Sequence, residues 1–345
     1  MTASAFITGV CDLALTAAER AFVREARPWG LILFKRNIDT AAQVMALVAS
    51  FREAVGAQAP VLVDQEGGRV QRLGPPHWPI YPPAAAYGAL YDRNRAAGIA
   101  AARLGARLIA ADLQRLGIDV DCLPVADVPA PAADPIIGDR AYGDTPAKVA
   151  TLAGAAAAGL IEGGVLPVLK HMPGHGRAAA DSHFKLPVVE ATRAELDATD
   201  FAAFRPLAGL PMGMTAHVVF SAYDPVNPAT TSVTMVQEVI RDSIGFKGLL
   251  MSDDVSMGAL SGSIAERTRA ALAAGCDIVL HCNGELPEME AVAGAAPVLT
   301  GEAAKRAAAA LSTRMAPTAI DEAEARRTLA DVLDEACFAD ARRAS

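Results

Sequence analysis

The sequence has no excess of positive charge. Among 345 residues, 31 are Lys or Arg and 39 are Asp or Glu, which gives a formal net charge of −8. A protein that binds nucleic acid usually presents a clustered basic face. The charge balance therefore argues against a nucleic-acid partner, and we expect the partner to be a small molecule.

A disulfide framework and a membrane-spanning segment are also missing. The five cysteines form no CxxC pair, so we expect a reducing, cytoplasmic environment. No apolar stretch approaches the ~20 residues that a spanning helix needs. The first residues carry Asp12 and no positive charge, which is unlike a secretory signal. We therefore expect a protein that is neither secreted nor embedded in a membrane.

The chain contains no linker rich in Pro, Gly and Ser and no internal repeat. Hydrophobic residues make up 52% of it and charged residues 20%, which is typical of a globular protein. Length alone does not set the number of domains, since α/β barrels often exceed 250 residues as one domain. We expect residues 1–345 to form a single domain.

Eight short apolar runs alternate with segments of helical pattern. Such runs, apolar throughout, are typical of parallel strands covered by helices. A capping box, Thr16-Ala-Ala-Glu19, marks one helix start, and Gly117, Gly163 and Gly275 stand where left-handed residues end helices. The expected strands are residues 5–10, 31–34, 61–63, 118–123, 165–169, 212–216, 248–251 and 277–280. The expected helices are residues 16–27, 40–54, 95–116, 145–162, 193–207, 234–243, 263–274 and 287 onward.

This alternation favours a (β/α)8 barrel of the TIM type. A doubly wound sheet is the alternative, but Gly9-Val10-Cys11-Asp12 after the first strand is not its glycine fingerprint. Residues 301–345 contain two further helical patterns, at 302–312 and 321–339. We expect them to be additional helices packed on the barrel.

Polar residues follow six of the eight predicted strands. In this barrel the active site lies at the C-terminal ends of the strands, so these residues are expected to converge. Each one taken singly would also fit an ordinary cap or loop residue. The polar residues at strand ends are Asp64, Asp127, Lys170, His171, His217, Asp253, Asp254 and His281.

The segment 168–189 holds three of the six histidines. Asp181 and His183 form Asp-Ser-His, and a carboxylate beside an imidazole raises its proton affinity, as a general acid requires. A loop histidine with a nearby charge is the alternative. His171 and His175 are four apart, but Pro173 between them prevents a helical metal-binding pair.

Three other motifs carry charged groups. Residues 64–72, DQEGGRVQR, place two carboxylates and two guanidinium groups around a Gly-Gly turn, which suits either a ligand with several hydroxyls or a salt-bridged loop. In residues 138–143, Asp139 either fixes Arg140 or belongs to an ordinary surface ion pair. Asp253 and Asp254 repel one another, so one should face the pocket while the other caps or pairs below.

Four motifs together resemble the glycoside hydrolase family 3 β-N-acetylglucosaminidases, the small bacterial β-hexosaminidases of cell-wall recycling. They are VDQEGGRVQRL from Val63, IGDRAYG from Ile137, LKHMPGHG from Leu169 followed by Asp-Ser-His, and MSDDVSM from Met251. The motifs come in the family's order, and the KHxPGHG motif is the most specific of them.

The resemblance implies a single-domain barrel and a retaining mechanism in two steps. Asp253 would be the nucleophile, with Asp254 as its supporting neighbour. His183, oriented by Asp181, would be the general acid and then the base, where most retaining glycosidases use a second carboxylate.

The resemblance also implies a binding set, a substrate and a location. The substrate would be N-acetylglucosamine β-1,4-linked to anhydro-N-acetylmuramic acid, handled in the cytoplasm without metal or organic cofactor. The sequence itself does not set the oligomeric state, and we expect a monomer. Met172 and Arg177 depart from the residues common in the family's loop. The residues that would bind the sugar are Asp64, Arg72, Arg140, Lys170 and His171.

Three alternatives stay open. One is a metal-dependent barrel hydrolase that uses His171, His175, Asp181 and His183, although strand one offers it no ligand. Another is a sugar-binding barrel without turnover. The third is a β-glucosidase of the same family, a branch that commonly carries a second domain.

Overall fold

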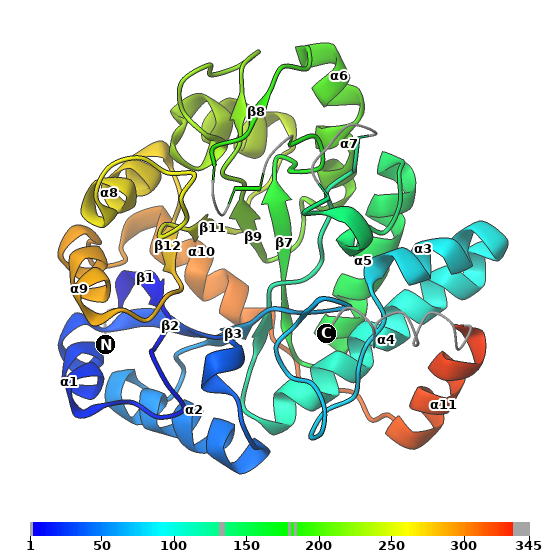
Figure 1. Cartoon of the computed structure of the whole chain (residues 1–345), viewed down its shortest axis with the longest axis horizontal. Coiled ribbons are helices and arrows are strands. Elements are labelled where there is room, and N and C mark those ends of the chain that lie inside the picture. Colours follow the sequence, from blue (N-terminus) through cyan, green and yellow to red (C-terminus); the bar gives the residue numbers. More distant parts are fainter. Residues whose placement is uncertain (1–2, 131–134, 179–180, 183–184, 334–345) are drawn as a thin grey trace.

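The computed structural model describes residues 3–130, 135–178, 181–182 and 185–333. Eight parallel strands close into a barrel in the order β1-β12-β11-β9-β7-β6-β3-β2 (Figure 1). All eight coincide with the expected apolar runs, so the (β/α)8 barrel is confirmed and the doubly wound alternative is wrong. The barrel strands are β1 (Ser4–Thr8), β2 (Pro28–Leu33), β3 (Val61–Val63), β6 (Val120–Asp121), β7 (Leu166–Met172), β9 (Met212–Thr215), β11 (Leu249–Asp254) and β12 (Ile278–His281).

Helices follow the strands and cover the outside of the barrel (Figure 1). The expected capping box is present at the first, where the Thr16 side chain accepts from Glu19 N at 3.1 Å and Glu19 Oε2 accepts from Thr16 N at 2.8 Å. Both bonds satisfy N–H groups that the helix itself leaves unpaired. The helices that match expectation are α1 (Ala17–Ala26), α2 (Ala41–Val55), α4 (Arg95–Arg115), α5 (Pro146–Glu162), α8 (Ile264–Ala274) and α9 (Leu286–Ala295).

Four local expectations differ from the structure. The helix expected at 193–207 is broken at Thr199 into α6 (Arg193–Ala198) and α7 (Asp200–Phe204), because the Thr199 hydroxyl bonds to Glu195 O and competes with the helix. The segment at 234–243 is the π-helix η5 (Met235–Ser243), and α3 (Ala84–Arg93) was not expected.

The fourth difference concerns the glycine after α5. Gly163 has a right-handed φ of −80°, and Gly164, with φ 76°, is the left-handed residue. Gly117 and Gly275 are left-handed as expected, with φ of 76° and 116°.

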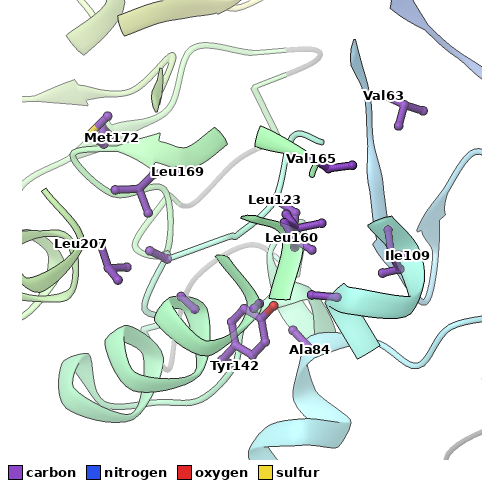
Figure 2. Packing of buried hydrophobic residues seen from close by; sticks show 14 of the residues in the cluster. Val63, Ala84, Ile109, Leu123, Tyr142, Leu160, Val165, Leu169, Met172 and Leu207 are labelled. Carbon is purple, nitrogen blue, oxygen red and sulfur yellow. The ribbon is translucent and has the colours of Figure 1, made fainter. Parts of the chain in front are cut away.

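The core has an inner and an outer layer. Inside the barrel, alternate strand residues such as Ile7, Val168 and Met212 are fully buried. Outside it, strand residues pack on the helices; Figure 2 shows Leu169 of β7 and Leu160 of α5 in this layer. Burial on both faces explains why the strands are apolar throughout.

Helix α10 (Gly301–Ser312) closes the N-terminal end of the barrel. Ala307 and Ala310 pack with the inner barrel residues, and Arg306 pairs at 2.7 Å with Asp277, which directly precedes β12. The other tail helix, α11 (Glu322–Val332), packs against α4. The opposite, C-terminal end of the strands is left for the site. No helix in the described part of the chain is long and apolar enough to cross a membrane.

Candidate active site

A cavity of about 330 Å³ opens at the C-terminal ends of the strands. Apolar residues, among them Phe34, Ile137 and Met257, form part of its wall. Six residues expected in the site from the sequence line the same cavity: Asp64, Arg72, Arg140, Lys170, His171 and Asp253. The structure therefore brings together the ends of β3, β7 and β11, the segment after β3 that carries Arg72, and the loop between β6 and β7 that carries Arg140.

One wall of the cavity is a buried network of ion pairs. Lys170 Nζ lies 2.9 Å from Asp64 Oδ1 and 2.6 Å from Glu66 Oε1. Arg72 Nη2 binds Asp64 Oδ2 at 2.9 Å, and Arg140 binds both Glu66 oxygens at 2.8 Å. Three cations thus share two anions, so the network keeps a net positive charge and rigid side chains at the cavity wall.

The network also fixes the protonation states of its members. Burial opposes ionisation of Glu66, but Arg140 and Lys170 outweigh it and lower its pKa to about 2. In the same way, Lys170 and Arg72 overcome the burial of Asp64 and hold its pKa well below the usual range. Burial lowers the pKa of Lys170, yet the two carboxylates raise it above its ordinary value. All three side chains are charged at neutral pH.

A short hairpin carries part of this network. Strands β4 (Gln65–Gly67) and β5 (Val70–Gln71) pair antiparallel and place Arg72 at the cavity wall and Glu66 against Lys170 and Arg140, which line it. Both turn glycines have positive φ, 91° at Gly67 and 56° at Gly68, which glycine adopts without strain. The Gly-Gly pair is thus needed for the turn that places the charges.

The interpretation that Asp139 fixes Arg140 is wrong. Asp139 pairs with Arg69 at 3.1 Å on the protein surface, whereas Arg140 turns inward to Glu66. A buried guanidinium gains more from a bidentate carboxylate than from an exposed neighbour in sequence. Glu66 was seen in the motif but not assigned to the site, since its partner lies 74 residues away.

His171 is oriented by a buried aspartate. Its Nδ1 lies 2.7 Å from Asp127 Oδ2, so Nδ1 carries the proton and Nε2 remains for a ligand in the cavity. Asp127 Oδ1 also accepts from the backbone N of His175 at 2.6 Å. Although burial would raise the pKa of Asp127, His171 lowers it. Asp127, noted only as a polar strand end, is thus the residue that organises this histidine pair.

His175 has a structural place beside the cavity. Burial and the neighbouring His171 lower its pKa to about 4, so its ring is neutral at pH 7. His175 Nε2 lies 3.0 Å from Ser182 Oγ. This contact fixes Ser182 of the Asp-Ser-His segment to the loop directly after β7.

The Asp181–His183 pair is only partly described. His183 lies outside the described residues, so its geometry stays a prediction. Ser182, between the two, lines the cavity, and its carbonyl accepts from Ala259 N at 3.2 Å. The segment is therefore joined to the β11 loop as well as to His175.

The two aspartates at the end of β11 have different surroundings. Asp254 Oδ1 accepts from Ser256 N at 2.9 Å and Cys282 N at 3.1 Å, and its Oδ2 accepts from Ser256 Oγ at 2.6 Å. Among the described residues, only Asp254 N donates to the Asp253 carboxylate, at 2.8 Å. Both aspartates line the cavity, but both oxygens of Asp254 are held by its loop, in keeping with the prediction that one of the pair is capped or paired.

A buried histidine supports this strand end. His217 Nε2 donates to Asp254 O at 2.9 Å, and Nδ1 lies 2.7 Å from Thr230 Oγ1. Burial would raise the pKa of Asp253, but His217 and then His171 lower it, which keeps Asp253 ionised. The position of His217 after a predicted strand was the only sequence sign of this role.

The described residues contain no cluster of three or more His, Cys, Asp or Glu placed to hold a metal ion. His171 and His175 are instead bound to Asp127 and Ser182. The geometry can bind a polar ring through charged donors and acceptors and can present one carboxylate, Asp253, to it.

Comparisons with known proteins agree on one family. Residues 8–316 match the model of the glycosyl hydrolase family 3 N terminal domain. The chain is 41% identical over 274 residues to a beta-hexosaminidase of Thioalkalivibrio sulfidiphilus, covering 78% of each chain. It superposes on NagZ from Neisseria gonorrhoeae, solved with N-trifluoroacetyl-D-glucosamine, with a TM-score of 0.84 at 32% identity, covering 97% of this chain and 99% of that one.

A second solved structure is a family 3 beta-N-acetylglucosaminidase from Paenibacillus. Its TM-score is 0.84 at 28% identity, and the match covers 95% of this chain and 66% of that one. This chain therefore spans about two thirds of the Paenibacillus enzyme. The similarities confirm the resemblance found in the sequence motifs.

Proposed function

Because the chain belongs to glycosyl hydrolase family 3 and is therefore a glycoside hydrolase, we propose that it is a retaining exo-β-N-acetylglucosaminidase. One observation carries the proposal: the ionised Asp253 and the five expected sugar-binding residues line a single cavity. Pockets for small ligands range from about 300 to 1,000 Å³. At about 330 Å³, this cavity suits one sugar unit.

In the first step, Asp253 attacks the anomeric carbon as the glycosidic C–O bond breaks, and His183 gives a proton to the leaving oxygen. A glycosyl-aspartate results. In the second step, water attacks the same carbon, His183 takes the proton from the water, and Asp253 leaves. Support for Asp253 over Asp254 comes from the hydrogen bonds that occupy both Asp254 oxygens.

His183 is proposed as the acid and base on the strength of its neighbours. Ser182, which precedes His183 in the chain, lines the same cavity as Asp253, and this supports the proposal. Asp181 would raise the proton affinity of the imidazole and so keep it protonated for the first step.

The ion-pair network is proposed to hold the sugar hydroxyls. Lys170 and Arg72 donate while Asp64 accepts, and their positions are fixed before a ligand arrives. His171 Nε2 and Arg140 complete the binding set. Such preorganisation avoids the entropy cost of ordering long side chains on binding.

The natural substrate is proposed to be a fragment of peptidoglycan. We propose N-acetylglucosamine linked to anhydro-N-acetylmuramic acid, with or without its peptide, cleaved in the cytoplasm by a single-domain enzyme that acts as a monomer and needs no cofactor. The relatives, a beta-hexosaminidase and a NagZ solved with N-trifluoroacetyl-D-glucosamine, support the N-acetylglucosamine part of this choice.

Hydrolysis of paired aryl glycosides tests the function. We expect rapid release of the aryl alcohol from the β-N-acetylglucosaminide and slow release from the β-glucoside. NMR should show the β-anomer of N-acetylglucosamine as the first sugar product. Faster cleavage of the glucoside would favour the β-glucosidase alternative. Activity that is lost with a chelator and restored by zinc would favour the metal-dependent one, and sugar binding without hydrolysis would favour a binding protein.

A further inference from the structure

Helix α11, late in the sequence, reaches Tyr81, a residue that is bonded to the β4–β5 hairpin of the active site. It lies beyond residue 316, where the family match ends, and packs on α4 with Ala325 and Leu329 buried. On the same helix, Arg326 turns toward the body of the protein whereas Arg327 is exposed and pairs with Glu324 at 2.7 Å. The two adjacent arginines thus have different surroundings.

Arg326, whose side chain is 32% exposed, is the outer end of a polar cluster whose other members, Tyr81 and Asp112, are buried. Its Nη1 donates to Tyr81 Oη at 3.0 Å, and its Nη2 donates to Asp112 Oδ1 at 2.9 Å. Tyr81 Oη in turn donates to Asp112 Oδ2 at 2.5 Å. Tyr81 is 2% exposed and Asp112 is 8% exposed. Loss of Arg326 removes one donor from the Tyr81 hydroxyl and one from Asp112, while these two buried groups keep their bond to each other.

Tyr81 connects this cluster to the β4–β5 hairpin through its backbone. Gly68 N donates to Tyr81 O at 2.9 Å, and Tyr81 N donates to Gln71 Oε1 at 2.9 Å. A Cβ on Gly67 would overlap the carbonyl of Pro82, so the turn rests directly on the residues after Tyr81. The turn and strand β5 of the hairpin are therefore both bonded to one residue, Tyr81, whose hydroxyl accepts from Arg326.

The hairpin carries Glu66, and Arg72 directly follows it. These two residues hold Lys170, Asp64 and Arg140 in the ion-pair network. We propose that Arg326 is a positioning residue for the sugar-binding wall, acting through Tyr81 and the β4–β5 hairpin. The inference rests on the proposed role of this wall in binding N-acetylglucosamine.

A purely structural role for α11 makes a different prediction. If Arg326 only tethers the helix, its loss lowers the unfolding temperature and leaves the sugar site of the folded protein unchanged. If it positions the wall, the folded protein binds sugar more weakly while the chemistry at Asp253, on another strand, is preserved.

The test compares Arg326→Gln, Arg326→Lys and Tyr81→Phe in the full chain, with Arg327→Gln as the matched control. KM and kcat on an aryl β-N-acetylglucosaminide, the Kd for N-acetylglucosamine and the unfolding temperature are measured, with the kinetics well below the lowest unfolding temperature. We expect Arg326→Gln to raise KM and Kd by about three- to tenfold, the range for one lost hydrogen bond, with kcat within about twofold.

The other variants sharpen the result. Arg326→Lys should recover part of the binding, Tyr81→Phe should shift KM in the same direction, and Arg327→Gln should match the wild type. Unchanged KM and Kd in Arg326→Gln, or in Tyr81→Phe if the first variant does not fold, would overturn the inference. If the wild type binds the sugar without hydrolysing it, the proposed function fails, while the Kd values still decide the role of Arg326.

Discussion

Lys170 is the cation shared by both carboxylates of the buried network, so its removal gives the sharpest test of that network. Its side chain is 3% exposed and lies within 2.9 Å of Asp64 and Glu66. Removing one partner of a buried ion pair costs about 3–5 kcal/mol. Asp64 keeps Arg72 and Glu66 keeps Arg140, so we expect Lys170→Met to lose about 3 kcal/mol, the lower end of this range.

The loss should depend on pH with a defined sign. Glu66 has a lowered pKa in the folded protein, 4.5 falling to about 2. Its stabilising contribution is therefore fully present above the unfolded value and lost as pH falls toward about 2. The shift corresponds to roughly 3 kcal/mol. Without Lys170 the pKa of Glu66 is lowered less. As the pH falls from 4.5 to about 2, the variant should therefore lose less stability than the wild type.

Urea unfolding at neutral and acidic pH, together with KM, measures both effects. The matched control is Lys305→Met, because the Lys305–Glu302 pair is exposed on both sides, and an exposed pair contributes about 0.5 kcal/mol or less. If Lys170→Met loses no more free energy of unfolding than Lys305→Met and its KM is unchanged, the reasoning that this network is buried, coupled and in contact with sugar is refuted.

Three further predictions concern the chemical groups. Asp253→Ala should reduce kcat by several orders of magnitude and Asp254→Ala by less; equal losses in well-folded variants would undo the assignment of the nucleophile. His217→Ala leaves the Asp254 carbonyl without its buried donor, so we expect kcat to fall by roughly tenfold, and unchanged kcat with weaker sugar binding would contradict a role at β11. His183→Ala should be least damaging on substrates with good leaving groups, because these need little protonation in the first step; a uniform loss across a series of aryl leaving groups would count against His183 as the acid.

The sequence was enough to predict the barrel because burial on both faces forces its strands to be apolar throughout. Residues 61–63 and 212–216, for example, coincide with β3 and β9. The break at Thr199 was not predictable in this way, since the helical pattern of 193–207 continues across it. It depends on a local hydroxyl bond and on Arg177, which reaches Thr199 and Asp200 from the loop after β7.

The sequence predicts those site residues whose place is decided by their position at the end of a strand. Asp64, Lys170 and Asp253 follow apolar runs, and parallel strands bring such residues to one end of a barrel. The ion pairs between these side chains were not predictable from the sequence, because they depend on distances in space. Arg140 was matched to its neighbour Asp139, yet the buried carboxylate available to it is Glu66, on the hairpin after another strand.

The covalent intermediate on Asp253 is the central claim, and trapping with a fluorinated N-acetylglucosamine donor tests it most directly. The fluorine slows both steps, and a good leaving group lets the first step outrun the second. Mass spectrometry of the digested protein should find the sugar on the peptide that contains Asp253, and no label in Asp253→Ala. A label on another residue, or full turnover with no trapped protein and a product of inverted configuration, would contradict the account.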